Sequence, residues 1–441
     1  MHYLKRSTLL LAMSAAAQFA QADPFVSDQS QAEGFVAGSH LDLLLRNFYY
    51  NHDGRHHFED NRDWTQGVFA NFSSGYTQGT VGFAVDAYGY WGIKLDGDAG
   101  AAGTGNLPLD RHGRPQDDYG KAGGALKVRI SKTELKFGDM QPTAPVFAAG
   151  GTRMMPQTAK GFALLSSEIQ GLDLEAGHFT AGTSPITTSS HGGLYATYAN
   201  VEANSADYLG GKYALTDNLS LQLYASELED VWRQYYANAN YQLPLSEGQA
   251  LNLDFNIYRT NDYGQARAGQ IDNTTWSLAA GYTFLSAHTL TLAFQKVDGD
   301  TPFDYIGFGD NGAGAAGDSI FLANSVQFSD FNGPGERSWQ LRYDLDLNTY
   351  GVPGLSFMAR YINGQGIDGT HADPNGKYID LYGKDGSHHE TDLEARYVVQ
   401  SGPAKDLSLR LRQAFHRANA DQGESDNNEL RLIVDYPISV F

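Results

Sequence analysis

The chain has 441 residues, 51 acidic and 31 basic side chains, a formal net charge of -20 and no cysteine. This acidic balance excludes nucleic acid as a partner, because a negatively charged surface repels phosphates. No run of eighteen apolar residues occurs, which excludes a membrane-spanning helix. Glycine accounts for 50 residues and aromatic residues for 12% of the chain. Together with short alternating segments, this composition indicates an all-β, non-cytosolic protein that needs no disulfides.

Residues 1–22 have the features of a secretory signal peptide. Lys5 and Arg6 form its positive start, an apolar stretch follows (STLLLAMSAAA), and residues 20–22 (AQA) match a cleavage site. We therefore expect cleavage after this site and a single mature domain over residues 23–441. Export places that domain in the periplasm, the outer membrane or the medium.

Residues 126–137 (LKVRISKTELKF) alternate apolar and polar side chains with a period of two. This is the pattern of a β-strand with two different faces. There Lys127 and Arg129 face away from the apolar side. The pattern recurs at residues 250–258, 275–295 and 338–361, and the last two segments each hold two runs joined by a turn. The apolar faces of these segments include Leu251, Phe255, Trp276, Leu290, Trp339 and Phe357.

A soluble β-sandwich would also alternate apolar and polar residues, so alternation alone leaves two architectures open. Two details favour a transmembrane barrel. Aromatic residues lie near the ends of the apolar faces, and short turns alternate with long connections rich in glycine and aspartate, as at residues 94–119 and 362–389. Strands of about ten residues allow about sixteen to eighteen strands, an even number, around an aqueous lumen. The last strand, residues 430–440, is followed by Phe441, a terminal aromatic residue typical of bacterial outer-membrane barrels.

Arginine faces the predicted lumen in the last three strands. The parity of the neighbouring leucines turns Arg396, Arg410, Arg412 and Arg431 inward. Because these strands adjoin one another, the four guanidinium groups would line one wall. There they would offer permanently charged donors to carboxylates. The alternative is that each arginine only pairs with an aspartate or glutamate of the lumen.

Five segments resemble the OprD family of outer-membrane porins, and the resemblance covers essentially the whole mature chain. These segments are GDMQPTAPVFAAGG (138–151), RTNDYGQARAG (259–269), FDYIGFG (303–309), DSIFLANSVQFSDFNGPGE (318–336) and HRANADQ (416–422). Within the family, the chain is most similar to the branch of basic amino acid and carbapenem channels. The resemblance implies an antiparallel barrel of eighteen strands in the bacterial outer membrane, with an inward-folded constriction loop.

The resemblance also implies which residues meet the solute. Residues 140–164 match the constriction loop, Arg153 matches its basic position at the narrowest point, and the four wall arginines match the family's basic ladder. The opposite, electronegative side is matched by Tyr198, Tyr305, Asp318, Ser325 and Asp330.

The chain departs from that branch at two positions. Phe328 stands in place of a tyrosine and His52 in place of an arginine. Both positions bear on fine substrate preference.

The implied function is passive uptake of small solutes that carry a carboxylate. Basic amino acids, small peptides and carbapenem-like antibiotics fit a lumen with positive charge on one side and negative charge on the other. We expect outer-membrane lipid and lipopolysaccharide around the barrel and one pore in each chain. The apolar faces leave the oligomeric state open, because no feature selects a trimer.

An enzymatic alternative comes from a serine-peptidase classification of the family, whose triad maps to His178, Asp230 and Ser319. A triad needs its base and nucleophile within hydrogen-bonding reach. Parity turns His178 toward lipid, Ser319 falls in a long loop, and no G-x-S-x-G turn occurs. We therefore expect no catalysis. A plugged structural barrel or adhesin is a further alternative, which the inward arginines disfavour.

Histidine pairs occur at His56-His57 and His388-His389. Adjacent residues point opposite ways in an extended chain, both pairs are expected in loops, and no cysteine is available. We therefore predict no metal site and no cofactor, although the acidic loops could bind divalent cations loosely.

Overall fold

The computed structural model describes residues 24–55, 58–309 and 317–441. The expected signal peptide, residues 1–22, and the pair His56-His57 lie outside these ranges. Within them, no helix is both long enough and apolar enough to cross a membrane.

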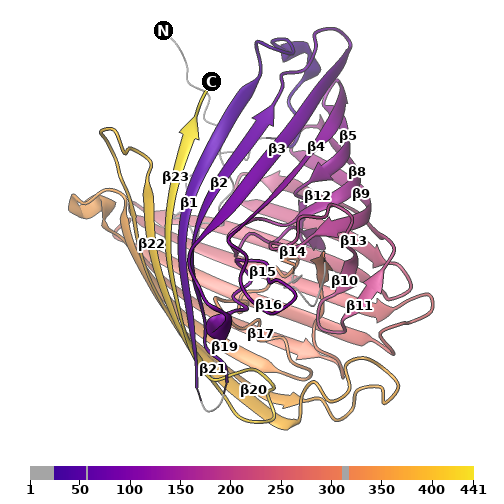
Figure 1. Ribbon diagram of the computed structural model, residues 1–441, viewed down its shortest axis with the longest axis vertical. Coiled ribbons are helices and arrows are strands. Elements are labelled where there is room, and N and C mark those ends of the chain that lie inside the picture. The colour runs from indigo at the N-terminus through magenta and orange to yellow at the C-terminus, as the bar shows by residue number, and fades with distance from the viewer. Residues whose placement is uncertain (1–23, 56–57, 310–316) are drawn as a thin grey trace.

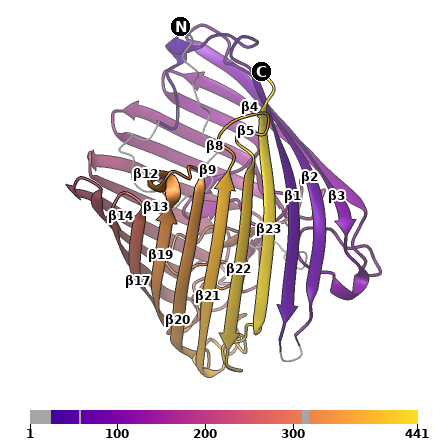
Figure 2. The same cartoon turned by 90° about the vertical axis from the view of Figure 1, so that its left-hand side faces the viewer.

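Eighteen antiparallel strands form one closed barrel, as predicted (Figures 1 and 2). Closure is made by β1 (His40–Gly54), which pairs with β2 on one side and with the last strand, β23 (Asn427–Ser439), on the other. Because the sheet has no free edge, every strand can pair its backbone groups inside a membrane.

The remaining barrel strands follow in chain order, each beside its predecessor. They are β2 (Asn61–Ser73), β3 (Val81–Asp96), β4 (Asp118–Ile130), β5 (Thr133–Met140), β8 (Thr158–Ile169), β9 (Leu172–Thr183), β12 (Ala206–Thr216), β13 (Leu219–Leu228), β14 (Trp232–Ser246), β15 (Gln249–Asp262), β16 (Asp272–Phe284), β17 (His288–Asp298), β19 (Arg337–Asp346), β20 (Leu355–Asp368), β21 (Lys384–Val398) and β22 (Ser408–Ala418).

Short elements occur in the connections. β10 (Leu194–Ala196), β11 (Val201–Ala203) and β18 (Ile306–Phe308) form a three-stranded sheet, and β6 (Thr143–Ala144) pairs with β7 (Phe147–Ala148). The 3-10 helices are η1 (Gln29–Gln31), η2 (Ala99–Ala101) and η4 (Leu347–Tyr350).

Alternation along each strand decides which side chains face out. In β15, Asn256, Tyr258 and Thr260 are buried on the lumen side, whereas Leu253 is exposed on the outside. Outward aromatic rings meet across strands, with Phe255 and Trp276 6.3 Å apart between centroids. All six residues predicted to face lipid lie in the outward phase: Leu251, Phe255, Trp276, Leu290, Trp339 and Phe357.

Short turns join the strands at one end of the barrel and long connections at the other. Residues 285–287 join β16 to β17, and Leu285 and Ser286 have φ values of 52° and 54°, the left-handed conformation that the central residues of a type I′ hairpin turn adopt. In outer-membrane barrels such short turns lie on the periplasmic side and the long loops outside.

Two predicted connections were too long. The strands continue to Asp96 and Asp368 on one side of each loop and restart at Asp118 and Lys384 on the other. His388-His389 therefore lies in β21 and not in a loop. The sequence prediction ended these strands early because their outer ends carry polar side chains that hide the apolar alternation.

The outward phase of β17 can be tested with Leu292, which is exposed near the middle of that strand. Leu292→Arg should lower the free energy of unfolding in lipid by ~2–4 kcal/mol, the cost of a basic side chain near the bilayer midplane. Leu285→Arg is the matched control, because Leu285 is equally exposed but lies in a turn. Urea titration in liposomes measures both. Equal losses for the two variants would show that Leu292 does not face the hydrocarbon.

Candidate functional site

The constriction loop, residues 141–157 between β5 and β8, enters the lumen. It is shorter than the predicted segment 140–164. Met140 ends β5, and residues 158–164 belong to β8, where Phe162 and Leu164 are exposed on the outer face. Outward apolar residues at alternate positions identify that part as membrane strand.

Aromatic stacking and hydrogen bonds hold the first half of the constriction loop against the wall. Phe147 is fully buried and stacks on Phe179 of β9, with centroids 4.6 Å apart. The Tyr258 hydroxyl donates to the Pro145 carbonyl oxygen at 3.1 Å. The Ala148 amide donates to Ser319 Oγ at 2.7 Å. The loop is therefore fixed by strands on one side and by the long loop, residues 299–336, on the other.

The second half of the constriction loop places Arg153 beside β1. The Arg153 carbonyl oxygen accepts from Arg46 Nη1 at 3.3 Å. The guanidinium carbon of Arg153 lies 5.4 Å from the centroid of the Tyr50 ring. Tyr50 donates to Glu429 Oε2 at 2.6 Å, and Glu429 pairs with Arg431 at 2.6 Å. Arg153 thus lies next to β23, the last strand of the basic wall that Arg396, Arg410, Arg412 and Arg431 form.

Arginines of the basic wall stand directly opposite one another across neighbouring strands. The register pairs Arg342 with Arg360, Arg396 with Arg410, and Arg412 with Arg431. Like charges in such positions destabilise a sheet, so their repetition indicates a role other than stability. Arg342 and Arg360 extend this wall and were not among the four arginines predicted from the sequence to face inward. Their parity in residues 338–361 was the signal that could have added them to the wall.

Carboxylates offset part of this charge. Arg410 makes a two-pronged contact with Glu394, at 2.8 Å for each bond, and Arg412 lies 3.2 Å from the same carboxylate. Arg396 donates to Ser408 Oγ at 3.3 Å. The alternative that each arginine pairs with an acid therefore describes Arg410, Arg412 and Arg431. Even so, one glutamate between two guanidinium groups leaves this stretch of wall net positive.

Asp330 is the centre of the opposite, electronegative cluster. Its Oδ2 accepts from the hydroxyls of Tyr198 and Tyr305, each at 2.9 Å, and its Oδ1 accepts from Ser325 Oγ at 2.6 Å. Burial raises the pKa of Asp330. Four of the residues named from the resemblance are therefore in direct contact.

Asp304 positions this cluster and was missed in the sequence. It accepts from the amides of Tyr198 at 2.9 Å and Tyr305 at 2.7 Å, and from the Tyr378 hydroxyl at 3.0 Å. Burial raises the pKa of Asp304 to about 6. A single aspartate in a loop gives no periodic signal, so only the fold reveals its partners.

Asp318 lies where the long loop meets the constriction loop, because its amide donates to the Ala148 carbonyl oxygen at 3.3 Å. Its side chain still reaches solvent, yet enclosure by the surrounding loops, together with the charge of Asp330, raises its pKa to about 6.

The two departures from the family pattern are neighbours in space. The rings of His52 and Phe328 are 5.7 Å apart, and His52 Nδ1 lies 4.0 Å from Glu429 Oε2. The Phe328 amide donates to Glu390 Oε1 at 2.9 Å. Both departures therefore lie in the same region of the lumen, where the long loop contacts the wall strands.

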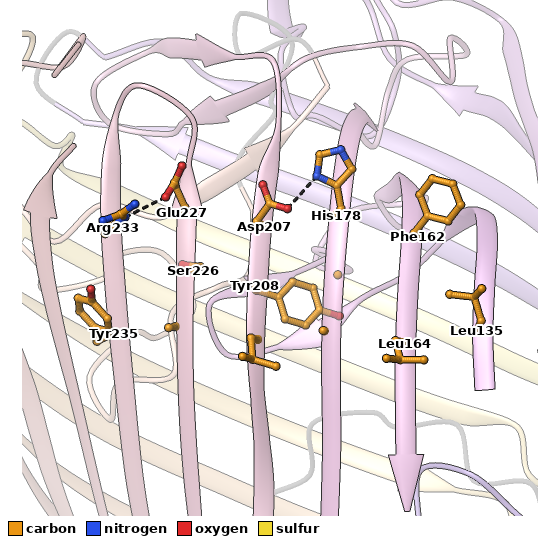
Figure 3. Close-up of a pocket in the computed structure, with 14 residues that line it drawn as sticks. Leu135, Phe162, Leu164, His178, Asp207, Tyr208, Ser226, Glu227, Arg233 and Tyr235 are labelled. Carbon is orange, nitrogen blue, oxygen red and sulfur yellow. Dashed lines mark hydrogen bonds and ion pairs between the residues drawn. The ribbon is translucent and has the colours of Figure 1, made fainter. Parts of the chain in front are cut away.

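The three residues of the mapped triad each have a different partner. His178 Nδ1 pairs with Asp207 at 2.8 Å on the outer face, beside a second exposed pair of Arg233 and Glu227 (Figure 3).

Asp230 accepts from the amide and side chain of Gln265, and the buried Ser319 accepts from the Ala148 amide. The structure does not bring these three residues together as a relay.

Comparisons with known proteins agree with this architecture. The family model described as "outer membrane porin, OprD family" matches residues 33–440. Porin D of Pseudomonas aeruginosa is 67% identical over the full length of both chains. Porin-like protein GalP of Pseudomonas putida is 36% identical over 93% of this chain and 95% of its own.

Solved structures agree as well. A crystal structure of Pseudomonas aeruginosa OprD has a TM-score of 0.84 and 64% identity, covering 95% of this chain and 100% of that one. The structure of Pseudomonas aeruginosa OpdK with vanillate has a TM-score of 0.82 and 36% identity, covering 92% and 100%.

The constriction loop can be shortened without disturbing the barrel, because Met140 and Ala159 already pair across β5 and β8. Replacing residues 143–156 by a short glycine-rich turn should raise single-channel conductance and reduce selectivity, since the obstruction is removed. Planar-bilayer recordings measure both. Deleting residues 403–404 in an exposed periplasmic turn is the control. Unchanged conductance after the loop replacement would contradict the assignment.

Proposed function

Because the chain belongs to the OprD family and is a substrate-specific outer-membrane porin, we propose that its preferred solutes are small zwitterions with an additional positive group. Basic amino acids and small basic peptides have this chemistry. Carbapenem-like antibiotics, with a carboxylate and a basic side chain, share it.

The observation that carries this proposal is the separation of charge within one constriction. Arg431 Nη2 donates to the Gln327 carbonyl oxygen of the long loop at 3.0 Å, so the loop touches the basic wall there. Three residues further along the same loop, Asp330 presents a carboxylate surrounded by hydroxyl groups. A solute passing this loop meets both signs of charge within a few residues.

The mechanism follows from electrostatics in a narrow, partly dehydrated lumen. Two unit charges 4 Å apart interact by about 1 kcal/mol in bulk water and by about 4 kcal/mol near a protein surface. The carboxylate of the solute would pass along the arginines while Asp330 attracts its positive group. Several shallow sites speed transit, because one deep site would trap the solute.

Phe328 and His52 should weaken the discrimination between basic and neutral amino acids. Phe328 lacks the hydroxyl that a tyrosine could offer to a cation. His52 lies near Glu429, and a histidine side chain, unlike that of arginine, is not permanently charged.

We propose no peptidase activity for this barrel. A nucleophilic serine needs a base within hydrogen-bonding reach. Ser319 is instead buried as the acceptor of a backbone amide, and His178 is on the outer face with Asp207. These partners support a structural role for both residues.

Lipopolysaccharide is the proposed neighbour of the outer rim. The exposed pairs His178–Asp207 and Arg233–Glu227 lie at the loop ends of β9, β12, β13 and β14. There they would meet charged headgroups rather than acyl chains. We further propose that residues 1–22 are removed as a signal peptide and that each chain forms its own pore.

Two charge-neutralising variants test the two sides separately. Asp330→Asn should lower arginine uptake about tenfold, as a loss of ~1.4 kcal/mol would give, and leave glutamate uptake little changed. Arg410→Ala should lower glutamate uptake about two- to threefold, because neighbouring arginines share the field and salt screens over about 8 Å. Liposome-swelling assays with both amino acids measure the rates.

Asp406→Asn, in an exposed periplasmic turn, is the matched control. Equal losses for both amino acids in both variants would mean that the wall charges set pore size or stability. In that case two-sided recognition would be wrong, although the barrel would remain a porin.

Acidification should weaken cation preference. The raised pKa values of Asp318, at about 6, and of Asp330 mean that both carboxyls gain protons, and lose negative charge, as the pH falls from 7.5 to 5. The reversal potential in a KCl gradient should therefore shift toward anion selectivity, and the shift should be smaller in Asp318→Asn. A pH-independent reversal potential would show that neither carboxyl sets the selectivity.

A further inference from the structure

A second polar cluster lies where the extracellular ends of β21 and β22 meet the loop between β22 and β23, residues 419–426. His388 of β21 and His416 of β22 are buried, and Glu424 of the loop is largely enclosed. His388 Nδ1, His416 Nε2 and Glu424 Oε2 converge, with separations of 3.0 Å between the two nitrogens and 3.5 and 3.3 Å to the carboxylate.

The outer nitrogen of each histidine already has an acceptor. His388 Nε2 faces Glu336 Oε1 at 2.8 Å, and His416 Nδ1 faces the Ser425 carbonyl oxygen at 2.8 Å. Each outer nitrogen must carry a hydrogen to make these bonds. In the neutral tautomers, His388 Nδ1 and His416 Nε2 are therefore lone pairs that point at each other and at a carboxylate. Three acceptors in contact need either a bound metal ion or an additional proton on one imidazole between them.

The spacing suits a metal ion. In a tetrahedral Zn²⁺ site with bonds of about 2.0–2.1 Å, the ligand atoms lie about 3.3 Å apart. The three separations here bracket that value. Each ligand also has the outer partner typical of metal sites: Glu336 for His388, the Ser425 carbonyl for His416, and Gln422 Nε2, which donates to Glu424 Oε2 at 2.8 Å.

We propose that His388, His416 and Glu424 bind a divalent transition-metal ion, Zn²⁺ in particular, with water as the fourth ligand. Two imidazoles and one carboxylate are a ligand set that Zn²⁺ takes with an open fourth position. This proposal departs from the sequence-based prediction of no metal site, which treated His388 and His389 as one pair. Only the inward residue of that pair belongs to the site, together with a histidine from the next strand.

The metal would join the wall to two loops. His388 stacks on Phe331, with centroids 4.0 Å apart, and His416 lies 4.9 Å from Phe328. These two phenylalanines flank Asp330 in the long loop. Bound Zn²⁺ would therefore stabilise the support of the electronegative cluster while the solute path itself stays free of metal.

Zinc titration of the purified, chelator-stripped full chain in detergent tests the site, with a chromophoric chelator as competitor. We expect one Zn²⁺ per chain, with affinity lowered more than a hundredfold in Glu424→Gln and in His416→Gln. Glu336→Gln should keep the stoichiometry and lower the affinity about 10- to 100-fold, because it removes only an outer partner. His389→Gln, the adjacent residue of β21, is the control and should bind like the wild type.

Two further readouts keep the result independent of folding and transport. Co²⁺ should give the intense visible bands of a tetrahedral site in the wild type and in His389→Gln, and not in Glu424→Gln or His416→Gln. Zn²⁺ should raise the thermal stability of the wild type and of His389→Gln and not of Glu424→Gln, a loop variant expected to fold. Absence of stoichiometric Zn²⁺ binding in the wild type would mean that a proton holds the cluster together and would overturn the proposal. Equal binding by Glu424→Gln and His389→Gln would overturn it as well.

Discussion

The structure depends on closure of the sheet. A strand inside a membrane has no water to satisfy its amides and carbonyls, so each must pair with a neighbour. The pairing of β1 with β23 completes that requirement for all eighteen strands. Once the barrel is closed, alternation forces every second side chain into the lumen. The constriction is then built by loops that enter this space and bind the inward side chains.

Like charges face one another in the lumen, an arrangement that destabilises a sheet. Arginines stand opposite one another on β19 to β23. Arg342, Arg360 and Arg431 each pair with a carboxylate of their own, whereas Arg410 and Arg412 share Glu394. On the other side of the constriction, the Asp330 carboxylate accepts hydrogen bonds from three hydroxyl groups. An arginine-rich wall and a separate carboxylate cluster suit a pore that must attract a charged solute without holding it.

Much of the fold could be predicted because alternation is a local signal. The outward phase of Trp339 and the inward phase of Arg410 follow from neighbours one or two residues away. Strand ends were harder, since polar residues at the outer rim break the apolar pattern before the strand ends. The constriction loop was placed at residues 140–164 from the family resemblance, and its predicted end ran into β8.

Contacts between distant segments could not be predicted in this way. Asp304 beneath Tyr198 and Tyr305, and His388 beside His416 and Glu424, are brought together by strand register and loop packing. No spacing within one segment encodes them. The residues named from the family resemblance did not depend on such spacing, because a resemblance carries the register of the whole barrel with it.

The most direct test of two-sided recognition is a crystal structure of the protein soaked with arginine at high concentration. Our account predicts the solute carboxylate within hydrogen-bonding distance of Arg396, Arg410 or Arg412, with a positive group directed toward Asp330 and its tyrosine hydroxyls. Arginine bound in the reverse orientation, or with its carboxylate away from the basic wall, would contradict it.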